Sequence, residues 1–128
     1  MSKINTSHSR VLLVDDETDI AFVLKNGLQS QGYDVETFCS STDAAATDAN
    51  LYDIAILDIR MPNMNGFQLA RSLWDQNDKL QVCFLSAFEI NKKEAETTLL
   101  NLKSHCFLTK PMLPSALAMH IEAHFANQ

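Results

Sequence analysis

Short hydrophobic runs alternate with segments of helical periodicity along the chain. The runs predict five strands, and a run without polar residues is typical of a strand that is buried on both faces of a parallel sheet. The predicted strands are Arg10 to Asp15, Asp34 to Phe38, Asp53 to Leu57, Gln81 to Leu85 and Cys106 to Leu108.

A segment with apolar residues at helical spacing follows each run. Strict alternation with short connections predicts right-handed crossovers, and therefore one α/β domain with a doubly wound, five-stranded parallel sheet and five helices. Residues 1–9 form a polar tail ahead of this domain. The predicted helices are Asp19 to Gln31, Ser41 to Asn50, Phe67 to Asp75, Asn91 to Lys103 and Pro114 to Ala126.

Capping residues set the expected ends of these helices. We expect Thr18 or Asp19 to cap the first helix, and Gly32 to end it. The third helix follows a loop, residues 62–66, whose proline, asparagine and glycine residues are typical of turns. The candidate caps of the second helix are Ser41, Thr42 and Asp43.

Acidic residues stand where two of the hydrophobic runs stop. Asp15 and Asp16 end the first run, and Asp58 ends the third. The carboxyl ends of parallel strands share one edge of the sheet, where open α/β sheets bind their ligands. Carboxylates crowded there repel one another unless a cation lies among them, and oxygen ligands suit Mg²⁺. The sequence therefore predicts a magnesium site beside Asp58.

Two further strands bring polar groups to the same edge. The fourth run leads into Ser86 and Ala87, and the fifth leads into Thr109 and Lys110. A carboxylate, a metal site, a hydroxyl and an ammonium suit phosphoryl transfer to a carboxylate, in which catalysis is mostly positioning and charge neutralisation. In this interpretation Asp58 attacks phosphorus, Lys110 neutralises charge on the phosphoryl oxygens, and Ser86 donates a hydrogen bond to one of them.

In this order and at these separations, the features resemble the receiver domain of two-component response regulators. The resemblance extends from Arg10 to about Phe125. It implies a flavodoxin-like fold with the strand order 2-1-3-4-5. The residues that carry it are Asp15-Asp16, Asp58, the loop Met61-Pro62-Asn63-Met64-Asn65-Gly66, Ser86-Ala87 and Lys110-Pro111.

The resemblance implies roles for the acidic residues. Asp58 would accept a phosphoryl group from a histidine kinase or a phosphotransfer protein. Mg²⁺ would be bound directly by Asp16 and Asp58, through water by Asp15, and by the backbone carbonyl of Arg60. The chain would then be a signalling domain that catalyses its own phosphorylation and dephosphorylation, and not an enzyme with a separate substrate.

The resemblance also implies a switch. Ser86 and Lys110 would contact the phosphoryl group, and Phe107 would be the aromatic residue that turns inward as Ser86 moves towards phosphate. The fourth helix, fifth strand and fifth helix would present the altered surface to an unknown downstream protein. An oligomer is left open, and a dimer linked to phosphorylation is one arrangement.

Some positions depart from the family pattern. Ser86 stands where many members have threonine, so the hydroxyl is kept. Phe107 stands where tyrosine is common, and it has no hydroxyl to donate a hydrogen bond. Arg60 and Phe88 are both large, and together with Ala87 they would form the rim of the pocket.

Other function classes fit parts of the pattern. A haloacid-dehalogenase-type phosphotransferase also uses an aspartate nucleophile and Mg²⁺, but it needs a second aspartate where this chain has Arg60. A flavodoxin-type module would bind phosphate after the first strand, where Asp15, Asp16 and Glu17 would repel it. A receiver-like interaction module that works without phosphorylation stays open as the alternative.

The net charge of −6 narrows the choice of partners. All of the acidic excess lies in residues 1–88, because residues 89–128 hold equal numbers of acids and bases. Direct binding of nucleic acid lacks its basic patch. The balanced last third is the better candidate for contact with a protein, and its apolar residues include Ile90, Leu99, Leu100, Leu113 and Leu117.

The remaining composition indicates a cytoplasmic protein. The three cysteines, Cys39, Cys83 and Cys106, are far apart and lie in or beside apolar stretches, so we expect reduced core thiols. His120 and His124 share a helix face, but two histidines without a third ligand seldom bind zinc. We expect no membrane span and no export, since an apolar run of about 20 residues and a signal peptide are both missing. The last predicted helix ends the chain, which leaves no room for an output domain, whether the chain is a stand-alone regulator or a piece of a larger protein.

Overall fold

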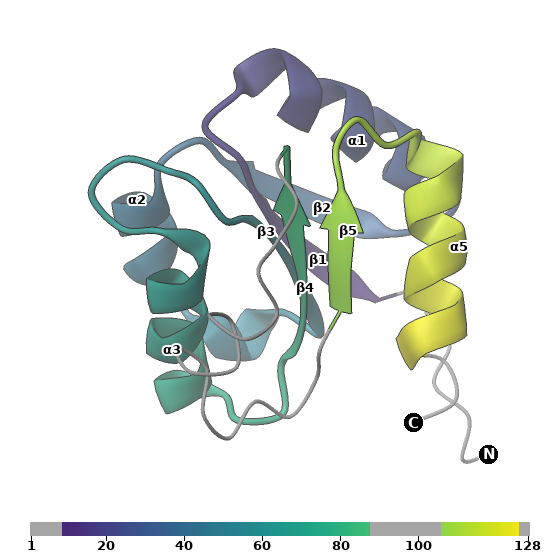
Figure 1. Cartoon of the computed structure of the whole chain (residues 1–128). Coiled ribbons are helices and arrows are strands. Elements are labelled where there is room, and N and C mark those ends of the chain that lie inside the picture. The colour runs from purple at the N-terminus through teal and green to yellow at the C-terminus, as the bar shows by residue number, and fades with distance from the viewer. Residues whose placement is uncertain (1–8, 88–105, 126–128) are drawn as a thin grey trace, which may run out of the picture.

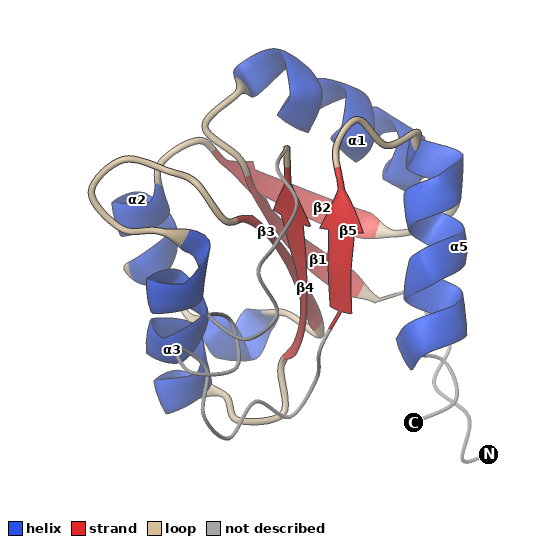
Figure 2. Cartoon of the chain, viewed as in Figure 1, coloured by secondary structure: helices blue, strands red, loops and turns tan. Residues whose placement is uncertain are grey.

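The computed structural model describes residues 9–87 and 106–125, which form a parallel sheet with helices on both faces (Figures 1 and 2). The strand order is β2-β1-β3-β4-β5, and every neighbouring pair is parallel. This confirms the predicted sheet and its order. The strands are β1 (Arg10–Val14), β2 (Asp34–Phe38), β3 (Ile54–Asp58), β4 (Gln81–Ser86) and β5 (Cys106–Thr109).

The helices lie in two layers, with α1 and α5 on one face of the sheet and α2 and α3 on the other (Figure 1). The predicted helix from Asn91 to Lys103 lies outside the described residues, so the expected number of five helices is not confirmed. Ile90, Leu99 and Leu100 lie outside them too. The described helices are α1 (Thr18–Ser30), α2 (Ser41–Ala45), the 3₁₀ helix η2 (Ala49–Leu51), α3 (Gly66–Gln76) and α5 (Pro114–Phe125).

Alternate side chains of the strands pack into two separate hydrophobic cores, one on each face of the sheet. Val11 and Leu13 of β1 pack in the cluster that includes α1 and α5, whereas Leu12 and Val14 pack in the cluster that includes α2 and α3. All four side chains are fully buried. Successive side chains of a strand point to opposite faces, so a strand covered on both faces needs apolar residues at every position. This is why the hydrophobic runs are continuous.

The start of α1 differs from the expectation. The N-cap is Glu17, whose side chain makes no capping hydrogen bond, and neither Thr18 nor Asp19 has that position. The end of α1 is as predicted, because Gly32 has a φ of 99°. The amides of Gly32 and Tyr33 donate to carbonyls of the last turn, which is the Schellman arrangement that favours glycine there.

The segment predicted as one helix from Ser41 to Asn50 is broken into α2 and η2. Ser40 caps α2 by accepting from the amide of Asp43, so all three expected caps are wrong by one residue or more. The break comes at Asp48, whose Oδ1 accepts from the amide of Asn50 at 3.0 Å. An aspartate side chain that accepts a hydrogen bond from a nearby backbone amide offers the backbone an alternative to helical hydrogen bonds. The alanine-rich composition of the segment predicted a helix and gave no sign of this alternative.

The loop between β3 and α3 is held by local bonds. Asn63 has a φ of 71°, a conformation that asparagine tolerates better than most residues. Asn65 and Gln68 form a capping box at the start of α3. Gly66 lies against the chain just after Asp58, and a Cβ at this position would lie 2.4 Å from the Asp58 carbonyl oxygen. The glycine therefore lets α3 begin directly beside the end of β3.

The cysteines correct the expectation of reduced core thiols. Cys83 of β4 and Cys106 of β5 are direct partners in the strand register, with Cα atoms 4.5 Å apart, and they form a disulfide. Cys39 is a free thiol that is exposed after β2. Spacing along the chain does not reveal which residues of two strands lie opposite each other, so sequence reasoning could not see that this pair lies within disulfide range.

Two other expectations concern sites and membranes. His120 is exposed on α5, and the side chain of His124 lies outside the described part, so the structure does not test a paired site there. Within residues 9–87 and 106–125, no helix is long and apolar enough to cross a membrane.

Candidate phosphorylation and metal site

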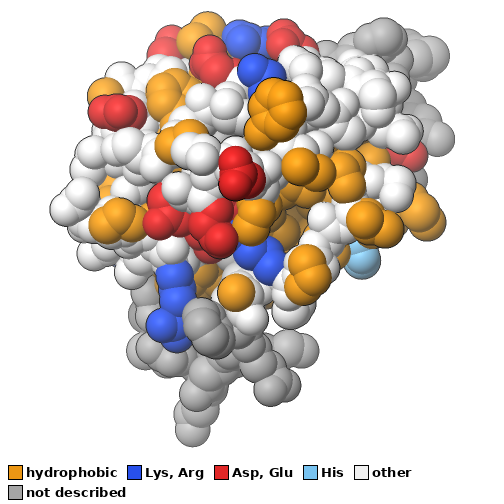
Figure 3. Space-filling model, turned by 90° about the horizontal axis from the view of Figure 1, so that it is seen from above, with side chains coloured by type: hydrophobic (Ala, Val, Ile, Leu, Met, Phe, Trp, Pro, Cys, Tyr) orange, Lys and Arg blue, Asp and Glu red, His pale blue; other side chains and the backbone are white. Residues whose placement is uncertain are grey.

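The predicted site residues meet at the carboxyl edge of the sheet. Asp15 follows β1, Asp58 ends β3, Ser86 ends β4 and Lys110 follows β5. Ser86 is paired with Thr109 in the parallel register, and the amide of Lys110 donates to the Ser86 carbonyl at 2.7 Å. Figure 3, which looks down on this edge, shows acidic side chains gathered beside a strip of hydrophobic ones.

The Lys110 ammonium binds the carboxylates of this edge. Its Nζ lies 2.7 Å from Asp15 Oδ2 and 3.4 Å from Asp58 Oδ2. It also lies 3.1 Å from Glu17 Oε1. The side chains of Lys110, Asp15 and Asp58 are 7%, 0% and 6% exposed, so these charges interact with little screening by water. One cation thus faces several carboxylates in a nearly dry pocket.

Three aspartates form a group that fits a divalent cation. Each of Asp15, Asp16 and Asp58 offers a carboxylate oxygen, and these atoms lie within 4.8 Å of one another. Asp15 and Asp58 are buried, whereas Asp16 is exposed. The donors are oxygen alone, which Mg²⁺ prefers, and an exposed member leaves room for the water that Mg²⁺ keeps. The structure therefore brings together the three predicted carboxylate ligands.

Burial and neighbouring charges shift the pKa values of Asp58 and Lys110. The pKa of Asp58 is raised from 3.8 to about 6, chiefly by burial and then by the charge of Asp15, while Lys110 opposes the rise. Burial acts to lower the pKa of Lys110, but the hydrogen bond and charge of Asp15, followed by Glu17 and Asp58, raise it overall. A divalent cation among the aspartates would favour the ionised form of Asp58.

The remaining predicted residues are placed as follows. The backbone around Asp58 is fixed, because the amide of Ile59 donates to the Leu85 carbonyl at 2.9 Å and the Ile59 carbonyl accepts from Gly66 at 2.8 Å. Arg60 comes next and is exposed, which suits a rim position. Ala87 is exposed at the end of β4, and Phe88 lies outside the described residues.

Phe107 belongs to a group of three rings. It stacks on Phe84 of β4 with centroids 5.4 Å apart, and it meets the edge of Phe67 of α3 at 6.5 Å. Its side chain is half-buried. The ring therefore packs against the strand that ends in Ser86.

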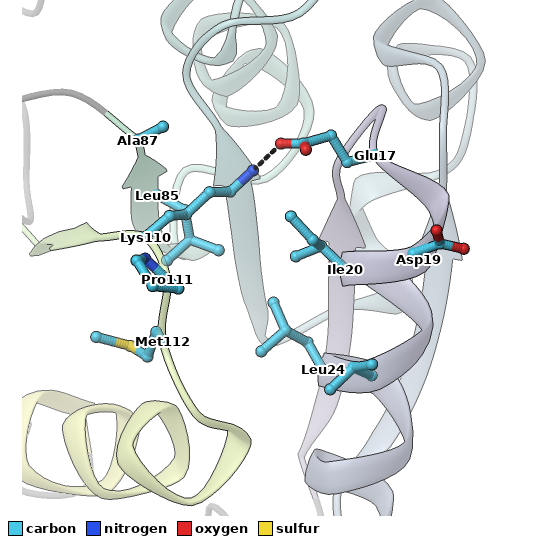
Figure 4. A pocket seen from close by; sticks show the side chains of 10 residues that line it. Glu17, Asp19, Ile20, Leu24, Leu85, Ala87, Lys110, Pro111 and Met112 are labelled. Atoms are coloured by element: carbon cyan, nitrogen blue, oxygen red, sulfur yellow. Dashed lines mark hydrogen bonds and ion pairs between the residues drawn. The ribbon is translucent and has the colours of Figure 1, made fainter.

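A groove adjoins the site, and sequence reasoning did not predict it. Figure 4 shows Lys110 reaching across one end of the groove to Glu17 at the start of α1. Its volume is about 530 Å³. The ion pair of Glu17 with Lys110 was not predicted either, although the place of Glu17 in the acidic run after the first strand was a signal. The apolar residues that line the groove are Ile20, Val23, Leu24, Leu85, Ala87, Pro111 and Met112.

A comparison with known sequences agrees with this geometry. The family model described as the response regulator receiver domain matches residues 11–122. The chain is 29% identical over 113 residues to the response regulator SaeR of Staphylococcus aureus strain USA300. That alignment covers 88% of this chain and 49% of SaeR, so the chain spans about half the length of this curated relative.

Solved structures show the same architecture. The chain is similar to the chemotaxis protein CheY4 of Vibrio cholerae, with a TM-score of 0.81, 26% identity, and coverage of 92% of this chain and 99% of that one. It is also similar to a CheY-like receiver domain protein from Methanospirillum hungatei JF-1, with a TM-score of 0.80 and 25% identity. That match covers 91% of this chain and 92% of the other. The similarity extends over nearly the whole of each of these two proteins.

Proposed function

The chain belongs to the response regulator receiver family, and on that premise we propose that it is a phosphorylation-activated signalling switch. Asp58 accepts a phosphoryl group from a histidine kinase or a phosphotransfer protein in a reaction that depends on Mg²⁺. The observation that carries the proposal is the convergence of Asp58 with two more aspartates and the Lys110 ammonium at one edge of the sheet. Arrangements of this kind suit phosphoryl transfer, since its transition state demands positioning and charge neutralisation.

The transfer step is balanced as follows. An ionised carboxylate oxygen of Asp58 forms a bond to phosphorus while the bond from phosphorus to the donor atom breaks, and the donor keeps that electron pair. When the donor is a phosphohistidine, the released imidazole nitrogen takes up a proton. Because the Asp58 side chain is only 6% exposed, competing water is kept away from most of the carboxylate.

The pocket residues divide the work of charge neutralisation. Asp15, Asp16 and Asp58 would hold Mg²⁺, and we propose the backbone carbonyl of Arg60 as a further ligand. The metal would supply positive charge to the phosphoryl oxygens, which a carboxylate-rich pocket otherwise repels. Lys110, whose Nζ lies 3.4 Å from Asp58 Oδ2, would bind another oxygen of the phosphoryl group.

The proposed response starts at Ser86. Its hydroxyl donates a hydrogen bond to the phosphoryl group, and the resulting movement gives Phe107 room to turn inward. The ring stack between Phe84 and Phe107 couples this movement to β5. The surface formed by the fourth helix, β5 and α5 then changes for a downstream protein partner.

The wider setting is also part of the proposal. We infer one receiver domain in residues 1–128, no direct contact with nucleic acid or membrane, and an oligomeric state that phosphorylation could alter. A cytoplasmic location follows from the proposed kinase partner. The cysteines do not support that location, because Cys83 and Cys106 form a disulfide and are not reduced thiols.

The alternative is a receiver-like interaction module that works without phosphorylation. Leu113 just before α5 and Met119 on α5 are apolar residues that are 71% and 72% exposed. They favour a binding surface for either function. Chemistry at Asp58 separates the two functions.

The test is the mass of the intact protein after incubation with Mg²⁺ and a small phosphodonor such as phosphoramidate. We expect one added phosphoryl group on the wild type, and none on Asp58→Asn or in the presence of a chelator. Asp43→Asn, an exposed aspartate at the start of α2, is the matched control and should be labelled like the wild type. A wild type that gains no phosphoryl group would leave the interaction module as the function.

A further inference from the structure

The Glu17 side chain has an unusual placement for a residue at the start of a helix. Short polar side chains usually cap a helix by accepting from its first amides. The Glu17 carboxylate does not do so, although its backbone is the N-cap of α1. It points across the groove to Lys110 (Figure 4), with Oε1 3.1 Å from Nζ. The ion pair thus joins the start of α1 to the segment after β5.

We propose that Glu17 is a positioning residue for Lys110. It holds the ammonium in the unphosphorylated protein, and it is the partner that the ammonium releases when a phosphoryl group is added to Asp58. The inference rests on the proposed function and identifies what must change at Lys110 when the switch operates.

The number of donors on Lys110 carries the first step. A lysine ammonium has three N–H donors. Asp15, Glu17 and Asp58 form ion pairs with Nζ at 2.7, 3.1 and 3.4 Å, so three carboxylates already surround the ammonium, and the contact with Glu17 is a hydrogen bond as well. A phosphoryl group adds strong acceptor oxygens at Asp58. To bind one of them, Lys110 must give up or weaken an existing partner.

The exposure of the three carboxylates identifies that partner. The Glu17 side chain is 56% exposed, whereas those of Asp15 and Asp58 are 0% and 6% exposed. An exposed carboxylate is hydrated easily when its ion pair opens, but a buried one is left without compensation. Glu17 is therefore the partner that costs least to release.

Glu17 also lies outside the candidate metal cluster, which consists of Asp15, Asp16 and Asp58. The Glu17 carboxylate would compete with the phosphoryl group for Lys110, but it would not take part in binding the metal. Opening the pair would also change the groove, whose lining includes Ile20 and Met112. Phosphorylation would then be detectable at α1 as well as at β5.

The test is a titration with beryllofluoride, a stable analogue of the phosphoryl group, at saturating Mg²⁺. Glu17→Gln keeps the size of the side chain and removes its charge. We expect it to lower the Kd for beryllofluoride about fivefold, which equals about 1 kcal/mol at 1.36 kcal/mol per tenfold change and lies at the upper end for an ion pair with one exposed partner. The Kd of each variant for Mg²⁺ is measured first, so that every titration is run at saturation.

Two further variants separate contact from charge. Asp19→Asn removes a charge from the same groove without touching Lys110, and its Kd should stay within about twofold of the wild type. Glu17→Asp keeps the charge but shortens the reach, so it should shift the Kd in the same direction as Glu17→Gln. If Asp19→Asn changed the Kd for beryllofluoride as much as Glu17→Gln did, and Glu17→Asp left it unchanged, the effect would come from the loss of a nearby negative charge and not from the contact with Lys110. That result would overturn the proposal.

Amide spectra give a second measurement. Beryllofluoride should shift the amides of Ile20 and Met112 in the wild type, and these shifts should shrink in Glu17→Gln, where the pair is already open. A wild type that binds beryllofluoride while Glu17→Gln has an unchanged Kd and unchanged shifts overturns the role of Glu17 alone. A wild type that does not bind it at saturating Mg²⁺ overturns the proposed function, and the role of Glu17 with it.

Discussion

Asp58 has an environment that disfavours its ionised form. It is 5% exposed, and the carboxylate of Asp15 lies close by, so ionisation costs free energy in the folded protein. Lys110 offsets only part of this cost, because the pKa of Asp58 still rises to about 6. Functional sites often retain such destabilising groups. The proposed phosphoacceptor should therefore weaken the fold when it is ionised.

The pH dependence of stability tests this at the residue scale. Because the folded pKa exceeds the ordinary value of 3.8, the folded protein binds the Asp58 proton more tightly than the unfolded chain does. The destabilisation is complete above about pH 6 and vanishes as the pH falls below about 4. In chelator, Asp58→Asn should raise the free energy of unfolding at about pH 8 by on the order of 1–3 kcal/mol, with little gain at low pH.

Urea denaturation at the two pH values is the measurement. Excess Mg²⁺ is the control, since an ion that binds the folded wild type more tightly than the variant should narrow the gap. If Asp58→Asn and the wild type had the same free energy of unfolding in chelator at both pH values, the claim that ionised Asp58 destabilises the fold would be refuted.

Residue patterns predicted most of the site, for a geometric reason. Asp15 and Lys110 follow parallel strands and Asp58 ends another, and the carboxyl ends of such strands share an edge. Glu17 was not assigned a role, because an acid at a helix start can cap, face water or form an ion pair. Its partner is 93 positions away in the sequence, and only the fold brings the two side chains together.

At the scale of the element, the turn from β3 into α3 places Asp58. Gly66 approaches the backbone so closely that a Cβ would lie 2.4 Å from the Asp58 carbonyl oxygen and 2.9 Å from the Ile59 Cα. These neighbours are backbone atoms of a buried strand end, so they can move little. The geometry of the site therefore depends on a residue that has no side chain.

Gly66→Ala should disturb stability and metal binding together. Relief of the contact requires a shift of the backbone that holds Asp58, with a loss of about 1–3 kcal/mol in the free energy of unfolding, as for other overpacked positions. The Kd for Mg²⁺ should rise several-fold for the same reason. Calorimetric titration with Mg²⁺ and urea denaturation measure the two effects.

Gly27→Ala is the matched control. A Cβ there would lie 1.9 Å from Pro114 Cβ, so the variant should also lose stability, but at the contact of α1 with α5 and away from Asp58. Its Kd for Mg²⁺ should stay close to that of the wild type. Loss of Mg²⁺ affinity in Gly27→Ala and not in Gly66→Ala would contradict this account of the turn.

Elements were predicted well where one force dominated. The strands match their predicted ranges to within one residue at each end. The clearest signal is that of β3, because burial on both faces requires apolar residues along the strand. The segment from Ser41 was predicted poorly, since alanine content favours a helix while Asp48 offers the backbone a competing bond. Such local competition is decided by contacts with other elements, among them the hydrogen bond from the Ala49 amide to Gln76 of α3.

At the scale of the whole molecule, the sheet brings together carboxylates and an ammonium from segments that are far apart in the chain. The pattern of strands and helices predicted a parallel α/β sheet, and the family resemblance supplied its strand order, which the structure confirms. The register between β4 and β5 was not predictable, and with it the pairing of Cys83 with Cys106 was missed. Contacts that depend on register or on the reach of a long side chain need the folded structure.

The central claim is that the Asp58 carboxylate becomes an acyl phosphate. Borohydride reduces an acyl phosphate of aspartate to homoserine, so it marks the phosphorylated residue permanently. The wild type is incubated with Mg²⁺ and phosphoramidate, reduced, digested and sequenced by mass. We predict homoserine at position 58 and aspartate at positions 15 and 16, with no homoserine when Mg²⁺ is chelated. Homoserine at another aspartate, or at none while the intact protein carries a phosphoryl group, would contradict the claim that Asp58 is the phosphoacceptor.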